Sequence, residues 1–346
     1  MTPIEPPEET NSFSVDDLKH IFERCNLDLV RYERIDEGVN TLFTVETGPD
    51  SQLVVVKAFT CSGAPGDVTT EVLLYRQMAA HTSIPVPTVI ATNPSPVRCS
   101  PWAVLQKVPG ENLDADTDRL PLEVLNRLYY EAGAYLGELH ATFEFDSFGN
   151  VAAEGDALIS DGSSSTWADM FNAILAPRLA GISSGRFSAF RPGVEQFLER
   201  TRYVLDDVDL PVLVHDDYRL GNMLVDPFVP SAPITAILDW ESAFVGHHEY
   251  DLAIAEYMMI EQQFDDPRDE SLRNRLRTRL YDGYSDRYSL TEDARAETRR
   301  HVYRVARILQ HMCAFPVVWD GHSRARRAQE AEVLERHLQN ALDAVY

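Results

Sequence analysis

The segment VLVHDDYRLGNMLVD, residues 212–226, places a histidine, two adjacent aspartates and an asparagine between two apolar runs. The runs VLV and MLV have the aliphatic composition of short buried strands. Charged and amide side chains between two such strands form either a solvated turn or an active site. The sequence on both sides helps to distinguish these two interpretations.

The second apolar run begins a predicted β-hairpin that ends in another acidic residue. NMLV leads into DPFVPSAP, a segment with three prolines, and ITAILDW returns. If the turn is centred near Pro230 and Ser231, Asn222 lies opposite Asp239, with Cβ atoms about 4.5 to 5.5 Å apart. An amide oxygen and a carboxylate at that separation suit Mg²⁺, which takes few protein ligands. The alternative is a polar hairpin end without a metal.

The spacing of His215, Asp217 and Asn222 fits the pattern H-x-D-x-x-x-x-N. In this pattern the aspartate orients a hydroxyl nucleophile or accepts its proton, and the asparagine binds a metal ion. The pattern is weak by itself, because it also arises by chance. Asp239 strengthens it, since it stands at the end of the returning strand, where a metal-binding aspartate is required.

The chain is strongly acidic: 55 Asp and Glu residues against 31 Lys and Arg residues give a net charge of -24. Such a surface repels nucleic acids and anionic membranes, so we expect neither as a partner. Only Lys19, Lys57 and Lys107 are lysines, which leaves 31 − 3 = 28 arginines. A large acid excess with few lysines indicates adaptation to molar salt, which screens charge repulsion; the alternative is a protein that is merely acidic.

The cysteines and the N-terminal sequence predict a soluble cytoplasmic protein. The four cysteines have no paired spacing, which argues against a zinc site and a disulfide framework; they are Cys25, Cys61, Cys99 and Cys313. The first residues, MTPIEPPEETNSF, contain neither a basic start nor an apolar block. They therefore predict no signal peptide and no membrane anchor.

The periodicity of the sequence predicts an α+β fold with two lobes. Residues 1–13 are expected to form a disordered tail, and Ser14 is expected to cap a short helix. Residues 28–59 predict an antiparallel three-stranded meander, followed by a helix in DVTTEVLLYRQMAAH and a strand in PWAVLQKV. From about Pro121 onward helical periods dominate, interrupted by the strands PVLV, NMLV and ITAIL. We place the N-terminal lobe at 14–108 and the C-terminal lobe at 109–346.

The segments VHDDYRLGNMLVD and ITAILDWESAFVGHHEYDLA together resemble the aminoglycoside phosphotransferase and choline kinase-like family. These proteins are small-molecule kinases with the bilobal protein-kinase-like fold, and the resemblance extends over about residues 28–255. It implies an enzyme that uses ATP and Mg²⁺ to phosphorylate a hydroxyl of an aminoglycoside-, sugar- or amino-alcohol-like substrate. By this resemblance Asp217 is the catalytic residue, and Asn222 and Asp239 bind Mg²⁺.

The resemblance also assigns nucleotide-binding roles in the N-terminal lobe. Lys57 in LVVVKAF is similar to the lysine that binds the nucleotide phosphates, and Glu71 to the helix glutamate that pairs with it. A semi-buried lysine among valines requires such a partner in any case. The backbone from Gln106 to Val108 corresponds to the hinge that meets adenine. The backbone from Gly38 to Thr41, which includes Asn40, would bind the phosphates.

Two positions depart from the family pattern. Asp216 stands where the family usually has glycine, and the phosphate loop DEGVNTLF contains Gly38 alone in place of a glycine pair. Neither departure removes a chemical group that the reaction needs. The phosphate loop is nevertheless the weakest of the motifs.

The remaining polar residues of the motif have simpler interpretations beside the functional ones. Arg219 either contacts the transferred phosphate, as a catalytic residue, or forms an exposed ion pair. His215 is expected to brace the loop backbone rather than transfer a proton. Asp251 is expected to brace the loop or cap a helix, and His247 and His248 are expected in a surface loop.

The sequence thus predicts an ATP-dependent small-molecule kinase that acts by positioning and metal clamping. A nucleotide-binding pseudokinase or regulatory module is the first alternative, and the complete set of ionic residues argues against it. A protein kinase is the second, and LDWE in place of a D-F-G stretch argues against that. The sequence predicts neither the acceptor nor the oligomeric state. Acidic side chains of the C-terminal helices would suit a cationic acceptor, but the acidity of the whole chain makes them uninformative; they are Glu256, Glu261, Asp265 and Asp266.

The charge balance generates a prediction about salt. Because a net charge of -24 opposes compaction at low ionic strength, the thermal unfolding midpoint should rise steeply between low and molar KCl. Differential scanning calorimetry across a KCl series measures it. A midpoint that does not change with KCl would contradict the adaptation to salt.

Overall fold

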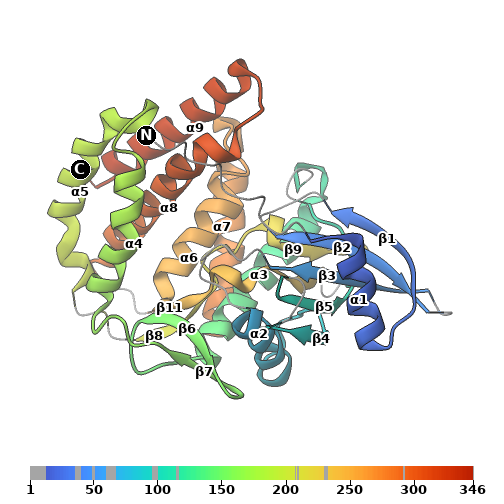
Figure 1. Cartoon of the computed structure of the whole chain (residues 1–346). Helices are drawn as coiled ribbons and strands as arrows, with labels where there is room; N and C mark the ends of the chain where they lie inside the picture. The colour runs from blue at the N-terminus through green and yellow to red at the C-terminus, as the bar shows by residue number, and fades with distance from the viewer. Residues whose placement is uncertain are drawn as a thin grey trace, which may run out of the picture.

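The computed structural model describes residues 13–35, 40–48, 51–59, 68–95, 100–113, 117–206, 208, 210–229, 233–290 and 293–345. They form an α+β fold, with a sheet-rich N-terminal lobe and a mainly helical C-terminal lobe (Figure 1). This architecture confirms the predicted fold class. Residues 1–12 of the predicted tail lie outside the described residues. Phe13, assigned to the same tail, packs instead against Phe43 of the sheet.

The N-terminal lobe is built on a five-stranded antiparallel sheet with the strand order β1-β2-β3-β5-β4. The strands are β1 (Leu29–Ile35), β2 (Thr41–Thr47), β3 (Gln52–Ala58), β4 (Val89–Asn93) and β5 (Trp102–Gln106). The first three are the predicted meander, and β5 is the predicted strand in PWAVLQKV. Strand β4 was not predicted, because it follows closely on the prolines that end the preceding helix.

Two helices cover opposite faces of this sheet. Helix α1 (Val15–Cys25) is capped by Ser14, as the sequence predicts, and packs on Val56 and Val104. Ser14 and Asp17 form a capping box, which was not predicted. Helix α2 (Val68–His81) shares a core with Ala103 and Leu105 on the other face. Side chains of a strand alternate between the two faces of the sheet. Because Val56 faces α1, the next residue, Lys57, faces α2. The alternation therefore brings the lysine to Glu71 of α2.

The C-terminal lobe contains most of the helices. They are α3 (Leu122–Thr142), α4 (Trp167–Gly181), α5 (Arg191–Thr201), α6 (His248–Glu256), α7 (Glu270–Ser285), α8 (Ala296–Val318) and α9 (Arg324–Asp343). Helices α3, α6 and α8 match the three predicted helical periods, and a π-helical turn, Tyr257–Glu261, extends α6. In Figure 1, α4, α5 and α9 lie at the end of the molecule away from strands β1–β5.

Two small sheets lie within this helical lobe. The hairpin β9 (Met223–Val225) and β10 (Ile234–Ile237) corresponds to the predicted strands NMLV and ITAIL. A four-stranded sheet has the order β7-β6-β11-β8, and only β8 (Pro211–Val214) was predicted. The others are β6 (Gly149–Glu154), β7 (Ala157–Ser160) and β11 (Phe244–His247). Strands β6 and β7 form a short hairpin with each other, and β11 gains its partners β6 and β8 across long stretches of chain.

Helices α3 and α7 cross at two glycines. A Cβ atom at Gly133 would lie 1.9 Å from the carbonyl oxygen of Leu280, and one at Gly283 would lie 1.9 Å from the carbonyl oxygen of Tyr130. The backbones of the two helices are therefore in direct contact, which only glycine permits at both positions. The contact fixes the position of α3 relative to α7.

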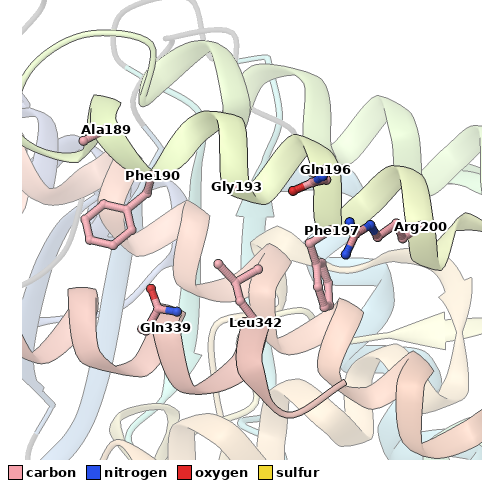
Figure 2. Close-up of a pocket in the computed structure, with 8 residues that line it drawn as sticks. All are labelled: Ala189, Phe190, Gly193, Gln196, Phe197, Arg200, Gln339 and Leu342. Atoms are coloured by element: carbon pink, nitrogen blue, oxygen red, sulfur yellow. The ribbon is translucent and has the colours of Figure 1, made fainter. Parts of the chain in front are cut away.

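A hollow of about 380 Å³ lies between α5 and α9, shown in Figure 2. Its lining mixes aromatic and polar side chains, and Gly193 of α5 opens onto it. A Cβ atom at Gly193 would meet no heavy atom within 4 Å.

Among the described helices, none combines the length and hydrophobicity needed to cross a lipid bilayer.

The helix crossing generates a prediction about stability. Gly283→Ala should destabilise the protein by about 1–3 kcal/mol or more, because the added methyl group forces two backbones apart. Gly193→Ala is the matched control: it adds the same methyl group in a helix with open space, and should raise stability by about 0.5–1 kcal/mol. Urea unfolding at fixed KCl measures both, and equal effects of the two substitutions would contradict the close packing.

Candidate active site

The segment HDDYRLGN forms a loop whose backbone is held by one buried carboxylate. Asp251 of α6 accepts hydrogen bonds from the backbone N–H groups of His215 at 2.7 Å and Asp216 at 3.1 Å. His215 continues the bracing: its Nδ1 accepts the Asp217 N–H at 3.3 Å, and its Nε2 donates to the Leu238 carbonyl at 3.0 Å. These bonds fit a neutral ring with its proton on Nε2. Both His215 and Asp251 therefore brace the loop, as the sequence predicts.

The side chain of Asp217 faces Asn222 across the loop. Asn222 donates from Nδ2 to Asp217 Oδ2 at 2.7 Å, and Arg219 donates from Nε to the same oxygen at 3.2 Å. Burial would raise the pKa of Asp217, but the charges of Arg307 and Arg219 and the Asn222 hydrogen bond lower it below its ordinary value. Asp217 is therefore an ionised hydrogen-bond acceptor.

Asp216 has hydrogen-bond partners that differ from those of Asp217. Its backbone is left-handed, with φ 61°, and its Oδ1 accepts hydrogen bonds from Tyr250 OH at 2.8 Å and Arg307 Nη2 at 2.9 Å. Glycine adopts such a φ most readily, which explains why the family pattern has glycine here. Aspartate tolerates the left-handed region better than most residues, and its carboxylate is paired.

Asp239 ends the hairpin one residue beyond the predicted register. Ile237 pairs with Met223, and the Leu238 N–H donates to the Asn222 carbonyl at 2.8 Å. Leu238 rather than Asp239 therefore lies opposite Asn222. The prediction was wrong by one residue, because Val225 pairs with Ile234 and a bulge in β10 then brings Met223 opposite Ile237.

The predicted ion pair between Lys57 and Glu71 is present, and it extends to the C-terminal lobe. Lys57 Nζ lies 2.9 Å from each carboxylate oxygen of Glu71 and 3.1 Å from Asp239 Oδ1. Glu241 Oε2 is 3.3 Å from the same nitrogen and accepts a hydrogen bond from Asn40 Nδ2. Burial alone would lower the pKa of Lys57, but these carboxylates raise it above its ordinary value. Lys57 is therefore charged and joins a strand, a helix and the hairpin end.

The sequence profile of the phosphotransferase enzyme family matches residues 31–297. The chain belongs to this family. Solved structures share the fold at low identity. An aminoglycoside 2'-phosphotransferase with GDP is 16% identical, with a TM-score of 0.63 and coverage of 94% of this chain and 98% of that one. A search of curated protein sequences finds no significant match.

Two further structures show how widely this fold is used. A microcompartment-associated aminopropanol kinase is 18% identical, with a TM-score of 0.62 and coverage of 94% of this chain and 96% of that one. A spectinomycin phosphotransferase in complex with ADP and spectinomycin is 14% identical, with a TM-score of 0.56 and coverage of 95% and 96%. At such identities the likeness concerns the fold alone.

The predicted hinge of the phosphotransferase leaves one backbone amide available. The Gln106 N–H donates to the Thr88 carbonyl at 2.8 Å, and the Lys107 N–H donates to the Leu53 carbonyl at 3.1 Å. Within the described part of the chain, the Val108 N–H has no backbone partner. Val108 is therefore the hinge position with a free donor. Gly38 of the predicted phosphate loop lies outside the described residues.

The acidic residues of the C-terminal helices are already paired with arginine. Glu256 and Glu261 both contact Arg277 and Arg304. Asp265 contacts Arg336 and His337, and Asp266 contacts Arg268. These carboxylates are therefore not a free anionic surface for a cationic acceptor.

Some residues of the site were not predicted. Glu241 and Tyr75 border Lys57 and Asp239, and Tyr250 and Arg307 border Asp216. Glu241 stands in the quoted motif LDWE, which could have identified it. No local signal separates Arg307 from the other arginines, because it reaches the loop from a distant helix.

His247 and His248 are buried at the start of α6, so their predicted place in a surface loop was wrong. His247 Nδ1 lies 2.8 Å from Tyr303 OH, and His248 packs against Tyr288. The preceding strand β11 pairs with β8 and β6, and this pairing, unseen in the sequence, covers the histidines. Burial lowers the pKa of His248 from 6.5 to about 3, and lowers that of His247 as well.

The buried histidines generate a prediction about pH. The unfolded chain protonates His248 below pH 6.5, whereas the folded chain keeps it neutral until about pH 3. The stability contributed by this neutral ring is present above pH 6.5 and is lost as the pH falls below it, by about 1.4 kcal/mol per pH unit. His248→Leu should therefore reduce the slope of stability against pH between pH 6 and 5, measured by urea unfolding. An unchanged slope would contradict the burial of a neutral His248.

Proposed function

We propose that this phosphotransferase transfers the γ-phosphoryl group of ATP to a hydroxyl group of a small molecule. The observation that carries the proposal is the position of Lys57, within 3.1 Å of both Glu71 and Asp239. A lysine fixed by a helix glutamate next to an aspartate at a hairpin end is the arrangement that phosphoryl transfer requires. We place the activity in the cytoplasm, where ATP is available.

The nucleotide is proposed to bind between Lys57 and the hinge. Lys57 would contact the phosphates while Glu71 holds its ammonium group in place, and the Val108 N–H, with Gln106 beside it, would meet adenine. Asn40 and Gly38 would lie along the phosphates. The solved relatives that bind GDP and ADP support a nucleotide site in this fold. ATP is the nucleotide that we propose, and the same assays repeated with GTP distinguish the two nucleotides.

Asn222 and Asp239 are suited to hold Mg²⁺. Asn222 uses its amide nitrogen for Asp217, and in the described chain its Oδ1 accepts no hydrogen bond. Asp239 is 41% exposed, and its Oδ2 likewise has no partner among the described residues. Two free hard oxygens fit Mg²⁺, which leaves most of its coordination to phosphates and water. When bound, the ion would neutralise charge on the phosphates.

Asp217 is proposed to orient the acceptor hydroxyl for attack. The hydroxyl oxygen forms a bond to the γ-phosphorus, the bond to the leaving oxygen of ADP breaks, and the hydroxyl proton passes to the Asp217 carboxylate. Arg219, hydrogen-bonded to Asp217, would lie near the transferred phosphoryl group. Catalysis of this kind depends on position and charge, with no covalent intermediate on the enzyme.

The acceptor is proposed to be an aminoglycoside-, sugar- or amino-alcohol-like molecule. The solved relatives include complexes with kanamycin and spectinomycin and an aminopropanol kinase, which supports a small hydroxylated acceptor. A phosphorylation screen in molar KCl over aminoglycosides, sugars and amino alcohols, followed by mass spectrometry, identifies the acceptor. A nucleotide-binding regulatory module would bind ATP without phosphorylating any of them.

The proposed roles generate a prediction about three aspartates. Asp217→Asn should reduce kcat by about 10² to 10⁴, the range for a positioned acid–base group, and leave Mg²⁺-ATP affinity near that of the wild type. Asp239→Ala should reduce both. Asp226→Asn, which keeps the oxygen that accepts the Phe228 N–H in the same hairpin, is the matched control and should retain activity.

Isothermal titration with Mg²⁺-ATP and an ATP-consumption assay separate these two effects. If no acceptor has been identified, ATP hydrolysis is measured instead. Full activity in Asp217→Asn would overturn the proposed function.

A further inference from the structure

Arg307 of α8 lies beside both adjacent aspartates of the catalytic loop. Its side chain is 2% exposed, with Nη2 2.9 Å from Asp216 Oδ1 and Nη1 3.8 Å from Asp217 Oδ1. The guanidinium of Arg307 thus contacts both Asp216 and Asp217, the second of which is proposed to take part in the reaction. The contact joins α8 to the loop, although Asp216 and Arg307 are 91 residues apart in the sequence.

The two oxygens of Asp217 have different surroundings. Oδ2 accepts hydrogen bonds from Asn222 and Arg219. Oδ1 accepts none from any residue that the structure describes, and it faces Arg307. Oδ1 is therefore the oxygen left to meet an acceptor hydroxyl, and Arg307 is the cation beside it.

A buried network holds Arg307 in place. Asp216 Oδ1 accepts hydrogen bonds from both Arg307 and Tyr250. Arg178 of α4 donates hydrogen bonds to Tyr250 OH and to the Ala306 carbonyl. Removing one member of a buried charge pair leaves the other without compensation. The network therefore fixes the position of the Arg307 guanidinium through its bond to Asp216, and this bond does not involve Asp217.

Stability alone does not explain an arginine at this position. Within the described residues, Arg307 Nε is buried without a hydrogen-bond partner, which lowers stability. Asp216 carries a second unfavourable feature, a left-handed backbone with φ 61° that suits glycine better. A glycine at 216 with an apolar residue at 307 would avoid both features, and would also remove the cation beside Asp217.

We propose that Arg307, anchored by Asp216, is a positioning residue that keeps Oδ1 of Asp217 directed toward the acceptor hydroxyl. This inference rests on the proposed function of Asp217. The pair acts through the orientation of one carboxylate, so its loss affects turnover and not nucleotide binding. A displacement of about 1 Å at a reacting group lowers the rate up to about 10²-fold.

The test is the double variant Asp216→Gly with Arg307→Met. It removes both charges together, and glycine suits the left-handed backbone, so the double variant should be more stable than Arg307→Met alone. We expect kcat to fall about 10- to 100-fold, with the KM for ATP unchanged. Arg307→Lys, which keeps the charge, should lose less kcat than Arg307→Met.

The matched control is the buried pair of Glu249 in α6 and Arg299, which like Arg307 lies in α8, with distances of 2.6 and 2.7 Å. Glu249→Gln with Arg299→Met removes a similar pair whose hydrogen-bond partners include neither Asp216 nor Asp217, and should alter stability but not kcat. Wild-type kcat in the folded Asp216→Gly/Arg307→Met enzyme would overturn the positioning role. If that variant does not fold, Arg307→Gln, which keeps a hydrogen-bond donor for Asp216 but removes the charge beside Asp217, takes its place, and wild-type kcat in Arg307→Gln overturns the positioning role.

Asp217→Asn, assayed in parallel, separates the two proposals. Loss of kcat in Asp217→Asn with full kcat in the double variant rejects only the positioning role of Arg307. Full kcat in Asp217→Asn rejects the proposed function itself. Loss of kcat in both, with normal kcat in the Glu249 and Arg299 control, supports the positioning pair.

Discussion

The buried carboxylate of Asp251 is the interaction on which the loop HDDYRLGN, proposed to be catalytic, depends. It accepts the N–H groups of His215 and Asp216 at once, and His140 Nε2 lies 3.4 Å from it. Two backbone bonds to one side chain fix the loop where it turns through the left-handed conformation of Asp216. The two neighbouring aspartates have different hydrogen-bond partners, Tyr250 and Arg307 for Asp216, and Asn222 and Arg219 for Asp217. A loop without this anchor would not hold the two neighbouring carboxylates in different surroundings.

Charge balance organises the remainder of the site. Lys57 is surrounded by the carboxylates of Glu71, Asp239 and Glu241, and Arg307 by those of Asp216 and Asp217. Each cluster carries more negative charge than one cation neutralises, although Arg219 adds a second cation beside Asp217. The excess around Lys57 is the electrostatic condition under which a divalent cation binds most readily. The same cluster holds the N-terminal sheet against the hairpin of the C-terminal lobe.

Arginine serves as the partner of buried acid throughout the C-terminal lobe. Arg299 donates hydrogen bonds to both carboxylate oxygens of Glu249. Arg277 and Arg304 each form ion pairs with both Glu256 and Glu261. A planar guanidinium with several donors satisfies a buried carboxylate more completely than an ammonium group does. In a chain with three lysines, this use of arginine leaves Lys57 as a distinct point charge at the place where phosphates are proposed to bind. The acidic helices are consequently occupied by internal pairs, and their acidity says little about an acceptor.

The sequence by itself determined the fold class, the pairing of Lys57 with Glu71 and the bracing roles of His215 and Asp251. These features depend on local spacing and on strand alternation, which the order of residues encodes directly. It placed Asp239 within one residue of its observed register, since the pairing of β9 with β10 and its bulge depend on the connection between them. Only the tertiary structure decided the burial of His247 and His248, the partners of the acidic helices and the position of Arg307 beside Asp217. Each of these arises where elements distant in the chain pack together, and local sequence carries no record of which side chains meet there.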